Sequence, residues 1–456
     1  MCYNPFHVSA KNVYRNSNVS ACCYDVPCGK CDACRDSNRS MWKCRIWHEL
    51  DYTYTHGGCA VFLTFTYNNE NLPILHLNGV DIPVFNHDHV KTFLNRLKIR
   101  MYRTYGKNMY KYFIAMEYGK HTKRQHLHGL FFLDKSVNYA DFTELCRSIW
   151  SDHGFMFPRC VNGRYVKDDG SDDCPLIRDA VKGAVYVSKY VTKDLSFYEL
   201  PSIVCAVHNN PDLMRSYLPK HFQSNNLGIS ILDKIDLSSD LAVVDSLTVG
   251  ISVPYSKTPI SLPRYIKKKL LFKNVKSDRV GLNGQSLYDC MPTSLFHSVS
   301  TLLYERKAFN MCQHIRKIFA RYLSLCPSAS APEVLDFKLL SNYILYFKNV
   351  DSHVLNSFAI YFDGDVDSFS DFTKVGFFYT LSKDNDFLKH NQYVSDSVVT
   401  FPFNSVFPSW LVDAYHFYVT ASSFCEEFQV KEFKRRSDER DRLRYKYQYY
   451  YPKNLC

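Results

Sequence analysis

Long apolar runs are missing from the sequence, which nowhere contains the roughly 18 consecutive apolar residues of a membrane-spanning helix. Residues 1–10 also lack the basic segment followed by an apolar segment that marks a secretory signal. We therefore expect a soluble intracellular protein with no membrane partner. The phosphate-binding pattern G-x-x-x-x-G-K-[ST] is absent as well, so no ATP-binding loop of that type is expected.

The composition fits a globular protein of two or three domains, because 456 residues with 46% hydrophobic content can fill packed cores. Lys and Arg number 56 against 45 Asp and Glu, which gives a net charge of +11. This modest basic excess is compatible with a polyanionic partner such as nucleic acid, because basic surfaces attract phosphate. Aromatic residues reach 16%. They either fill the cores or offer faces on which unpaired bases stack.

Cysteine is concentrated at the start of the chain, where seven of the 17 cysteines fall within the first 44 residues. In a reducing compartment this clustering indicates metal binding rather than disulfides. Cys28, Cys31 and Cys34 form the pattern C-x-x-C-x-x-C, in which Gly29 allows a tight loop. We expect these three thiolates to bind a structural Zn²⁺. The candidates for a fourth ligand are the other N-terminal cysteines, Cys2, Cys22, Cys23 and Cys44.

Two alternatives remain open for this cysteine motif. An iron–sulfur cluster of the bacterial ferredoxin type needs a fourth cysteine three residues later, followed by proline, whereas Arg35, Asp36 and Ser37 follow here. The thiols could also carry no metal. In every case we expect the motif to organise the N-terminal region rather than to take part in catalysis.

The chain divides into a Cys-rich region at 1–50, a region at 51–230 that mixes strands with helices, and a region at 231–456 with weaker signals. The clearest predicted elements are strands at 59–67, 109–119 and 126–133, and helices at 87–106 and 184–195. Since they do not alternate regularly, the predicted fold class is α+β, with a mainly antiparallel central sheet flanked by helices. The last region has no assigned motif and is a candidate for binding DNA or a host factor.

Two histidines lie two residues apart in the predicted strand at 126–133. Successive side chains of a strand point to opposite faces, so His126 and His128 share one face. Glu117 lies near the end of the preceding strand, and a short hairpin would place its carboxylate beside the two imidazoles. Such a donor set can bind Mg²⁺ or Mn²⁺ and leave positions open for substrate oxygens. The alternative for Glu117 is a surface carboxylate on the hairpin.

The phrase YVSKYVTK at 186–193 repeats a tyrosine and a lysine at a spacing of four. In a helix this spacing places Tyr186 and Tyr190 on one face about a turn apart, with Lys189 and Lys193 beside them. A phenol oxygen can displace a sugar 3′ oxygen from a metal-activated phosphate and form a 5′-phosphotyrosyl bond. A basic neighbour favours the phenolate. Taken alone, such a pair more often serves packing, and only its combination with the metal donors indicates catalysis.

Positive charge also clusters elsewhere in the sequence. The predicted helix at 87–106 carries five basic residues, which are typical of a solvated face. Arg264 and the three lysines at 267–269 cluster more tightly and are better candidates for phosphate contact. The run at 431–451 mixes basic with acidic residues, as a solvated helix does.

The ordered set FLTFTY, HLHGLFF and YVSKYVTK resembles the HUH endonucleases, most closely the rolling-circle replication initiators of small single-stranded DNA phages of the microvirus group, especially gokushovirus-like ones. The stretches VPCGKCDACR, EYGKHTKRQHLHGLFF and NNLG are similar to that family too, and the resemblance covers residues 1–230. It implies an HUH-type nuclease domain that acts on single-stranded DNA at the replication origin, in the cytoplasm of a bacterial host. It also implies a host helicase and a host DNA polymerase as partners.

The resemblance implies roles for individual residues as well. The implied metal ligands are His126, His128 and Glu117, and the implied catalytic residues are the nucleophiles Tyr186 and Tyr190 with Lys189 assisting. One tyrosine would open the origin, and the other would resolve the displaced strand. Two alternative functions stay open: a relaxase or transposase of the same nuclease class, and a zinc-stabilised nucleic-acid-binding protein without catalysis.

Overall fold

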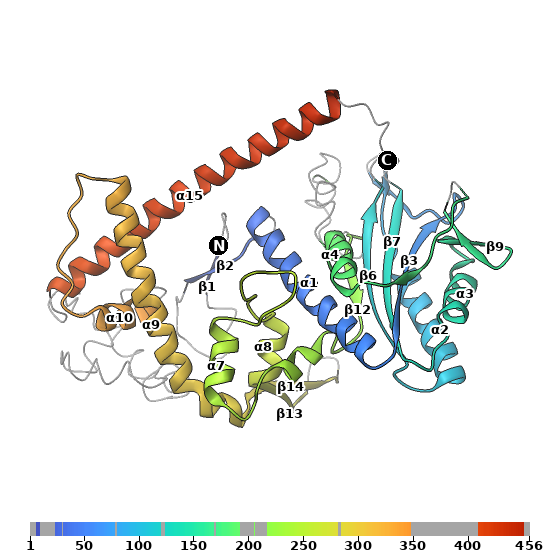
Figure 1. Cartoon of the computed structure of the whole chain (residues 1–456), viewed down its shortest axis with the longest axis horizontal. Helices are drawn as coiled ribbons and strands as arrows, with labels where there is room; N and C mark the ends of the chain where they lie inside the picture. Colours follow the sequence, from blue (N-terminus) through green and yellow to red (C-terminus); the bar gives the residue numbers. More distant parts are fainter. Residues whose placement is uncertain are drawn as a thin grey trace. The chain divides into compact units, whose positions relative to one another are not determined.

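The computed structural model describes residues 6–9, 23–29, 31–77, 80–119, 124–167, 170–191, 205, 217–280, 284–347 and 409–450. Contacts divide the chain into two compact units, one formed by Gly29–Thr293 and the other by Met1–Cys28 with Ser294–Cys456. Figure 1 shows the elements of both units. The predicted region boundaries at residues 50 and 230 both fall inside helical segments of the first unit. The division of functions among the three regions stays a prediction.

A six-stranded sheet forms the centre of the first unit, and all of its strand pairs are antiparallel. Its strands are β3 (Cys59–Tyr67), β6 (Tyr110–Tyr118), β7 (Gln125–Leu133), β8 (Gly154–Phe157), β11 (Leu176–Ile177) and β12 (His221–Gln223). The hydrogen-bonded order is β11-β3-β7-β6-β12, and β8 pairs with β3. The three strands predicted from the sequence are confirmed, and β6 and β7 form the predicted hairpin. β7 lies in the middle of the sheet.

Helices cover both faces of this sheet (Figure 1). One face packs against α1 (Asp32–Thr55) and α4 (Ala180–Ser188), and the other against α2 (His87–Tyr105) and α3 (Tyr139–Trp150). An antiparallel sheet with flanking helices is the α+β class that the sequence predicts. No helix in the described part of the chain is both long and apolar enough to cross a membrane.

Strand alternation separates the two cores on either side of the sheet. In β7, Leu127 and Phe131 are buried in the core that contains α2 and α3. Leu130 instead belongs to the core that contains Ile46 of α1 and Val187 of α4. Because side chains alternate along a strand, the even-numbered residues of β7, including both histidines, face α1 and α4. A slip of one residue would move the histidines to the opposite face.

Helix α2 has recognisable signals at both ends. Its N-cap is Asn86, whose side chain accepts a hydrogen bond from the backbone N–H of Asp88 at 2.9 Å. It ends at Gly106, whose φ of 95° lies in the left-handed region that favours glycine. Its buried apolar residues recur at helical spacing and are Val90, Phe93, Leu94, Leu97 and Met101. The helix predicted at 87–106 is therefore confirmed.

Smaller elements complete the first unit. Two short hairpins are formed by β4 (Ile74–Leu77) with β5 (Val80–Pro83) and by β9 (Arg159–Val161) with β10 (Arg164–Val166). After β12 the chain forms η4 (Ile229–Lys234), α7 (Asp240–Thr248) and α8 (Arg264–Leu271). The unit closes with a separate two-stranded ribbon of β13 (Phe272–Val280) and β14 (Ser286–Pro292).

The second unit is mainly helical in its described part. It contains a short hairpin of β1 (Phe6–Ser9) with β2 (Cys23–Val26), and the helices α9 (Ser294–Leu325), α10 (Phe337–Phe347) and α15 (Ser409–Tyr450). Ile315, Leu340 and Leu411, one from each helix, share a fully buried core. Near the end of α15, Glu432 pairs with Arg435 and Arg436 on the surface, in agreement with the predicted solvated helix.

Candidate active site and cysteine cluster

The two histidines of β7 have polar neighbours on both adjacent strands. On β3, Thr66 lies opposite His126 and Thr64 lies opposite His128. On β6, Glu117 lies opposite His126. Residues that face each other across an antiparallel pair point to the same side of the sheet. The register therefore places the Glu117 carboxylate on the face of the two imidazoles, as the hairpin prediction requires.

The imidazole of His128 has a partner at each ring nitrogen. Its Nε2 lies 2.8 Å from Oε2 of Glu117, and its Nδ1 lies 3.1 Å from Oγ1 of Thr64. The side chains of His128 and Glu117 are only 12% and 6% exposed. Polar contacts are stronger in such a partly dry environment than in water. His128 and Glu117 thus form an orientated pair of potential metal donors.

His126 lies further along the same face of β7, and its ring centroid is 6.4 Å from that of His128. Gly119 leaves space for this ring, because a Cβ at position 119 would lie 3.0 Å from Nε2 of His126. Across the strand pair, the hydroxyl oxygen of Thr66 is buried and has no hydrogen-bond partner among the described residues. The His126 side of the site therefore combines an imidazole with an unused buried oxygen.

The two tyrosines approach the histidines from the helical layer. α4 begins after Asp179, whose side chain accepts a hydrogen bond from the backbone N–H of Lys182, and it ends at Ser188. The chain continues as one 3-10 turn, η2 (Lys189–Val191). The predicted helix at 184–195 thus exists in part, and residues 192–195 lie outside the described residues. Tyr186 occupies α4, and Tyr190 occupies η2.

Tyr190 is in contact with the histidine site. Its ring stacks on that of His128, with centroids 4.0 Å apart and planes inclined by 30°. The ring of Tyr186 lies 5.4 Å from that of Tyr190 in an edge-to-face arrangement. The structure therefore brings both tyrosines, Glu117 and His128 together at one place on the sheet.

The environments of the two tyrosines differ. Tyr186 is 45% exposed, whereas Tyr190 is only 8% exposed. Burial and a hydrogen bond with Tyr186 raise the pKa of Tyr190 well above that of an ordinary phenol. Lys189 Nζ lies 5.9 Å from the centre of the Tyr186 ring. Lys193, the second lysine of the repeated phrase, lies outside the described residues.

Two residues at this site were not singled out from the sequence. Phe62 of β3 packs 5.7 Å from His128, 5.3 Å from Tyr186 and 6.1 Å from Tyr190, measured between ring centroids. Thr64, two residues later on the same face, contacts His128 as described above. The available signal was the two-residue period of the strand at 59–67, which puts Phe62, Thr64 and Thr66 on one face.

The donors at the site suit a divalent cation by their chemistry, since they comprise two imidazoles and one carboxylate. His128 and Glu117 are already in contact. Within the described residues, however, only the cysteine cluster described next brings three potential ligand atoms within 4.8 Å of one another. An ion shared by Glu117, His126 and His128 therefore requires some adjustment of these side chains.

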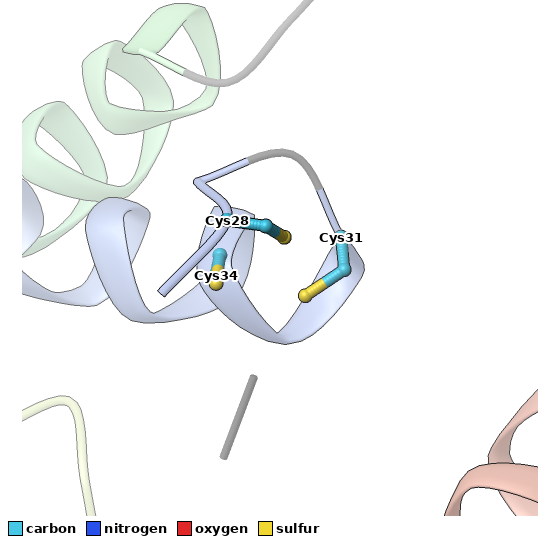
Figure 2. Close-up of side chains that lie close together, drawn as sticks. All are labelled: Cys28, Cys31 and Cys34. Atoms are coloured by element: carbon cyan, nitrogen blue, oxygen red, sulfur yellow. The ribbon is translucent and has the colours of Figure 1, made fainter. Parts of the chain in front are cut away.

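The three cysteines of the N-terminal motif lie close together at the start of α1 (Figure 2). Cys31 is the N-cap residue of α1 and Cys34 lies in its first turn, while Gly29, with a φ of 72°, forms the turn after Cys28. The three Sγ atoms all lie within 4.8 Å of one another. Three converging thiols at this spacing can hold a metal ion. The cluster predicted from the C-x-x-C-x-x-C pattern is therefore formed.

Cys44, one of the four candidates for a fourth ligand, is separated from this cluster. It lies ten residues after Cys34 in the same helix, which corresponds to a rise of about 15 Å. Its thiol is buried, and burial raises the pKa of Cys44 to about 11. These observations exclude Cys44 as a ligand of the cluster. Cys2 and Cys22 lie outside the described residues, and Cys23 is the first residue of β2.

Comparison with known proteins gives matches for the part of the chain that carries the sheet. Residues 60–195 match a family of replication-associated proteins that is described under the name ORF2. The replication-associated protein ORF2 of Spiroplasma virus 4 is 29% identical over 140 residues, which cover 28% of this chain and 42% of the relative. The replication-associated protein VP4 of Bdellovibrio phage phiMH2K is 29% identical over 207 residues, which cover 42% of this chain and 56% of the relative. No solved structure gives a significant match.

The chain thus spans about half the length of the curated relatives that it matches. The family match includes every residue predicted for the nuclease site, from Glu117 to Tyr190, and does not include the cysteine cluster. Over its sheet-forming part, the chain is a distant relative of phage replication-associated proteins.

Proposed function

We propose that this protein initiates rolling-circle replication of a phage genome, using an HUH-type nuclease domain to nick and rejoin single-stranded DNA at the origin through a 5′-phosphotyrosine intermediate. The observation that carries the proposal is the 4.0 Å stacking of Tyr190 on His128, which in turn contacts Glu117. Potential nucleophiles and potential metal donors therefore share one face of the sheet. The similarity of residues 60–195 to phage replication-associated proteins supports the same conclusion.

Tyr186 is the first nucleophile in this proposal, because it is 45% exposed and an incoming phosphate can reach it without rearrangement. Its hydroxyl oxygen forms a bond to phosphorus while the bond between phosphorus and the sugar 3′ oxygen breaks. The phenol releases its proton, and the departing 3′ oxygen takes one up. His126, His128 and Glu117 would hold Mg²⁺ or Mn²⁺, which when bound polarises the phosphodiester. Lys189 would neutralise part of the phosphate charge.

Tyr190 is the second nucleophile in this proposal. It is buried, and its hydrogen bond with Tyr186 helps to keep it protonated. Once Tyr186 is esterified to DNA, its oxygen no longer carries a proton, and the interaction that holds Tyr190 changes. Tyr190 can then attack the phosphate at the end of the displaced strand, which transfers the 5′ end to the second tyrosine and allows the first to be released.

The remaining parts of the proposal concern partners and location. The substrate is single-stranded DNA at the phage origin, and the protein acts in the cytoplasm of the bacterial host. A host helicase and a host DNA polymerase would supply unwinding and synthesis. In this view residues 51–230 provide the nuclease, and residues 231–456 contribute binding of DNA or host factors. A relaxase or transposase of the same nuclease class is the nearest alternative.

Covalent trapping tests the proposal directly. The full chain is incubated with labelled single strands that tile the phage origin, in the presence of Mn²⁺, and resolved under denaturing conditions. We expect a covalent adduct that is lost in the double variant Tyr186→Phe/Tyr190→Phe. The single variant Tyr186→Phe should remove most first-strand adduct, whereas Tyr190→Phe should retain it and lose strand transfer.

The matched control for this experiment is Tyr102→Phe, because Tyr102 is an exposed tyrosine of α2, on the other face of the sheet. This variant should form the adduct at the rate of the unmodified protein. An adduct that persists in the double variant would contradict the assignment of the nucleophiles. Mobility shifts without any adduct, over the whole tiled set, would favour the non-catalytic nucleic-acid-binding alternative.

We also propose that the Cys28, Cys31 and Cys34 cluster holds a structural Zn²⁺. The convergence of three thiols at the start of a helix supports this choice, because a helix N-terminus stabilises thiolates and zinc favours sulfur ligands. With Cys44 excluded, the fourth ligand comes from the remaining N-terminal cysteines or from another group. An iron–sulfur cluster and metal-free thiols are the alternatives, and the experiment that separates them closes the Discussion.

A further inference from the structure

Positive charge is concentrated in one short part of the first unit. Residues 264–292, which form α8, β13 and β14, contain seven basic and two acidic residues, so they carry a net charge of +5 out of +11 for the whole chain. The helix leads directly into the first strand, and Figure 1 shows the three elements next to one another. We call the exposed side chains of these elements the ribbon surface.

Not every lysine of this segment is available to a partner. Lys267 Nζ donates a hydrogen bond to the carbonyl oxygen of Leu247 at 3.0 Å and therefore fastens α8 to the end of α7. The apolar side of α8, including Ile266 and Leu270, is buried. Lys268 and Lys269 lie on the exposed side of the helix. The fold thus uses one lysine internally and presents the others to solvent.

The strands continue this exposed basic surface. Lys273 and Lys276 of β13 are exposed, and Tyr288 of β14, which pairs directly with Lys276, is 64% exposed. Within the described residues, none of Lys268, Lys269, Lys273 and Lys276 forms an ion pair with a carboxylate. A two-stranded ribbon has little core of its own and leaves both faces open. An exposed tyrosine ring is therefore flanked by uncompensated ammonium groups.

We propose that the ribbon surface binds single-stranded DNA, with its exposed lysines at the phosphates and Tyr288 stacking on an unpaired base. Lysines that follow a backbone, combined with an aromatic platform, are the chemistry by which proteins hold single strands. Duplex DNA supplies the same phosphates, but its bases are stacked inside the helix and give Tyr288 no partner. The proposal deepens the proposed function and rests on it for the identity of the ligand, since it names a second contact region for the same DNA.

Equilibrium binding without cleavage tests this inference. Fluorescence anisotropy of a labelled mixed-sequence single strand is measured with the full chain in EDTA over a series of salt concentrations. The double variant Lys273→Gln/Lys276→Gln should reduce the slope of log affinity against log salt by roughly 1.4, because each phosphate contact on a single strand contributes about 0.7. Tyr288→Ala should weaken binding roughly tenfold at fixed salt, as expected for the loss of one stacked base.

The chain offers matched controls for both changes. Lys98→Gln/Lys107→Gln removes the same charge from exposed positions elsewhere in the unit, and Tyr102→Ala removes a tyrosine that is 57% exposed. These variants should bind with the affinity of the unmodified protein, and all variants should keep its thermal unfolding temperature. The inference is overturned if the ribbon variants lose no more affinity than the controls, or if Tyr288→Ala weakens duplex binding as much as single-strand binding.

The outcome also separates this inference from the proposed nuclease function. If covalent adducts form normally and the ribbon variants bind like the controls, the ribbon surface is excluded while the nuclease function stands. If the ribbon variants lose single-strand affinity but no adduct forms with any origin strand, the ribbon surface is supported and the nuclease function fails. A complete lack of single-strand binding by the unmodified protein would overturn both.

Discussion

Thr64 has the position of a residue that orients a metal ligand. Its Oγ1 lies 3.1 Å from Nδ1 of His128, while Nε2 of the same ring faces Glu117. If Nδ1 carries the proton and donates to Thr64, Nε2 keeps its lone pair for a cation. We therefore predict that Thr64→Val, which keeps the shape of the side chain, weakens Mn²⁺ binding by roughly 10- to 100-fold.

Calorimetric titration of the full chain with Mn²⁺ checks this prediction without relying on DNA cleavage. Thr104→Val is the control, because Thr104 is an exposed residue of α2 whose hydroxyl donates only to the backbone oxygen of Arg100. It should leave the affinity unchanged. An unaltered Mn²⁺ affinity of Thr64→Val would show that Thr64 only packs beside His128.

The sequence allowed some of these residues to be predicted and not others. His126 and His128 could be placed on one face because strand alternation is a local property. Thr64 and Phe62 could not be assigned to the same site, because the pairing register between β3 and β7 depends on contacts between segments more than 60 residues apart. Local patterns fix the facing of a side chain, but only the fold determines its neighbours.

The segment with the two tyrosines shows the same limit for a whole element. A helix was predicted there, but its start could not be placed, and the structure begins it at Ala180, after the Asp179 cap. The described helix also tightens into a 3-10 turn at Lys189, which short helix ends commonly do. The spacing of four still brings Tyr186 and Tyr190 together, because both helix types keep residues one turn apart on nearby faces.

Helix α1 contains a buried histidine that makes stability depend on pH. His48 is 2% exposed, and neither of its ring nitrogens has a hydrogen-bond partner among the described residues. Burial lowers the pKa of His48 to about 4, compared with about 6.5 in an unfolded chain. Between these values the unfolded state binds more protons than the folded state, so the free energy of unfolding falls as the pH falls. Protonation of His48 should cost roughly 2 kcal/mol between about pH 7 and pH 5.

Urea unfolding of the full chain at these two pH values, with and without His48→Leu, measures this contribution. The variant should lose less stability on acidification than the unmodified protein, by roughly the same 2 kcal/mol. The exposed His56 at the end of the same helix provides the control variant His56→Leu, which should acidify like the unmodified protein. Equal losses in all three proteins would show that other groups control acid stability.

The organisation of the whole chain could be predicted only in outline. The α+β class followed from mixed strands and helices, but the packing of α1 did not. Trp42, Ile46 and Leu50 recur every four residues and are buried on the sheet beside α4, so one continuous helix leads from the cysteine cluster into the core behind the histidines. Helical spacing predicts such an apolar stripe, whereas its partner surface depends on tertiary contacts.

This continuity gives the cysteine cluster a consequence for the stability of the protein. A metal that ties Cys28, Cys31 and Cys34 together fixes the first turn of α1, so we predict one Zn²⁺ per chain by elemental analysis and a loss of that zinc in Cys31→Ser. The variant should unfold at least about 4 °C lower, since about 2 kcal/mol shifts the midpoint by that amount in a chain of this size. Cys174→Ser, which changes an exposed cysteine outside the cluster, should keep both the zinc and the unfolding temperature. Visible absorption with bound iron would instead indicate an iron–sulfur cluster, and a metal-free protein with unchanged stability in Cys31→Ser would leave the three thiols without a structural role.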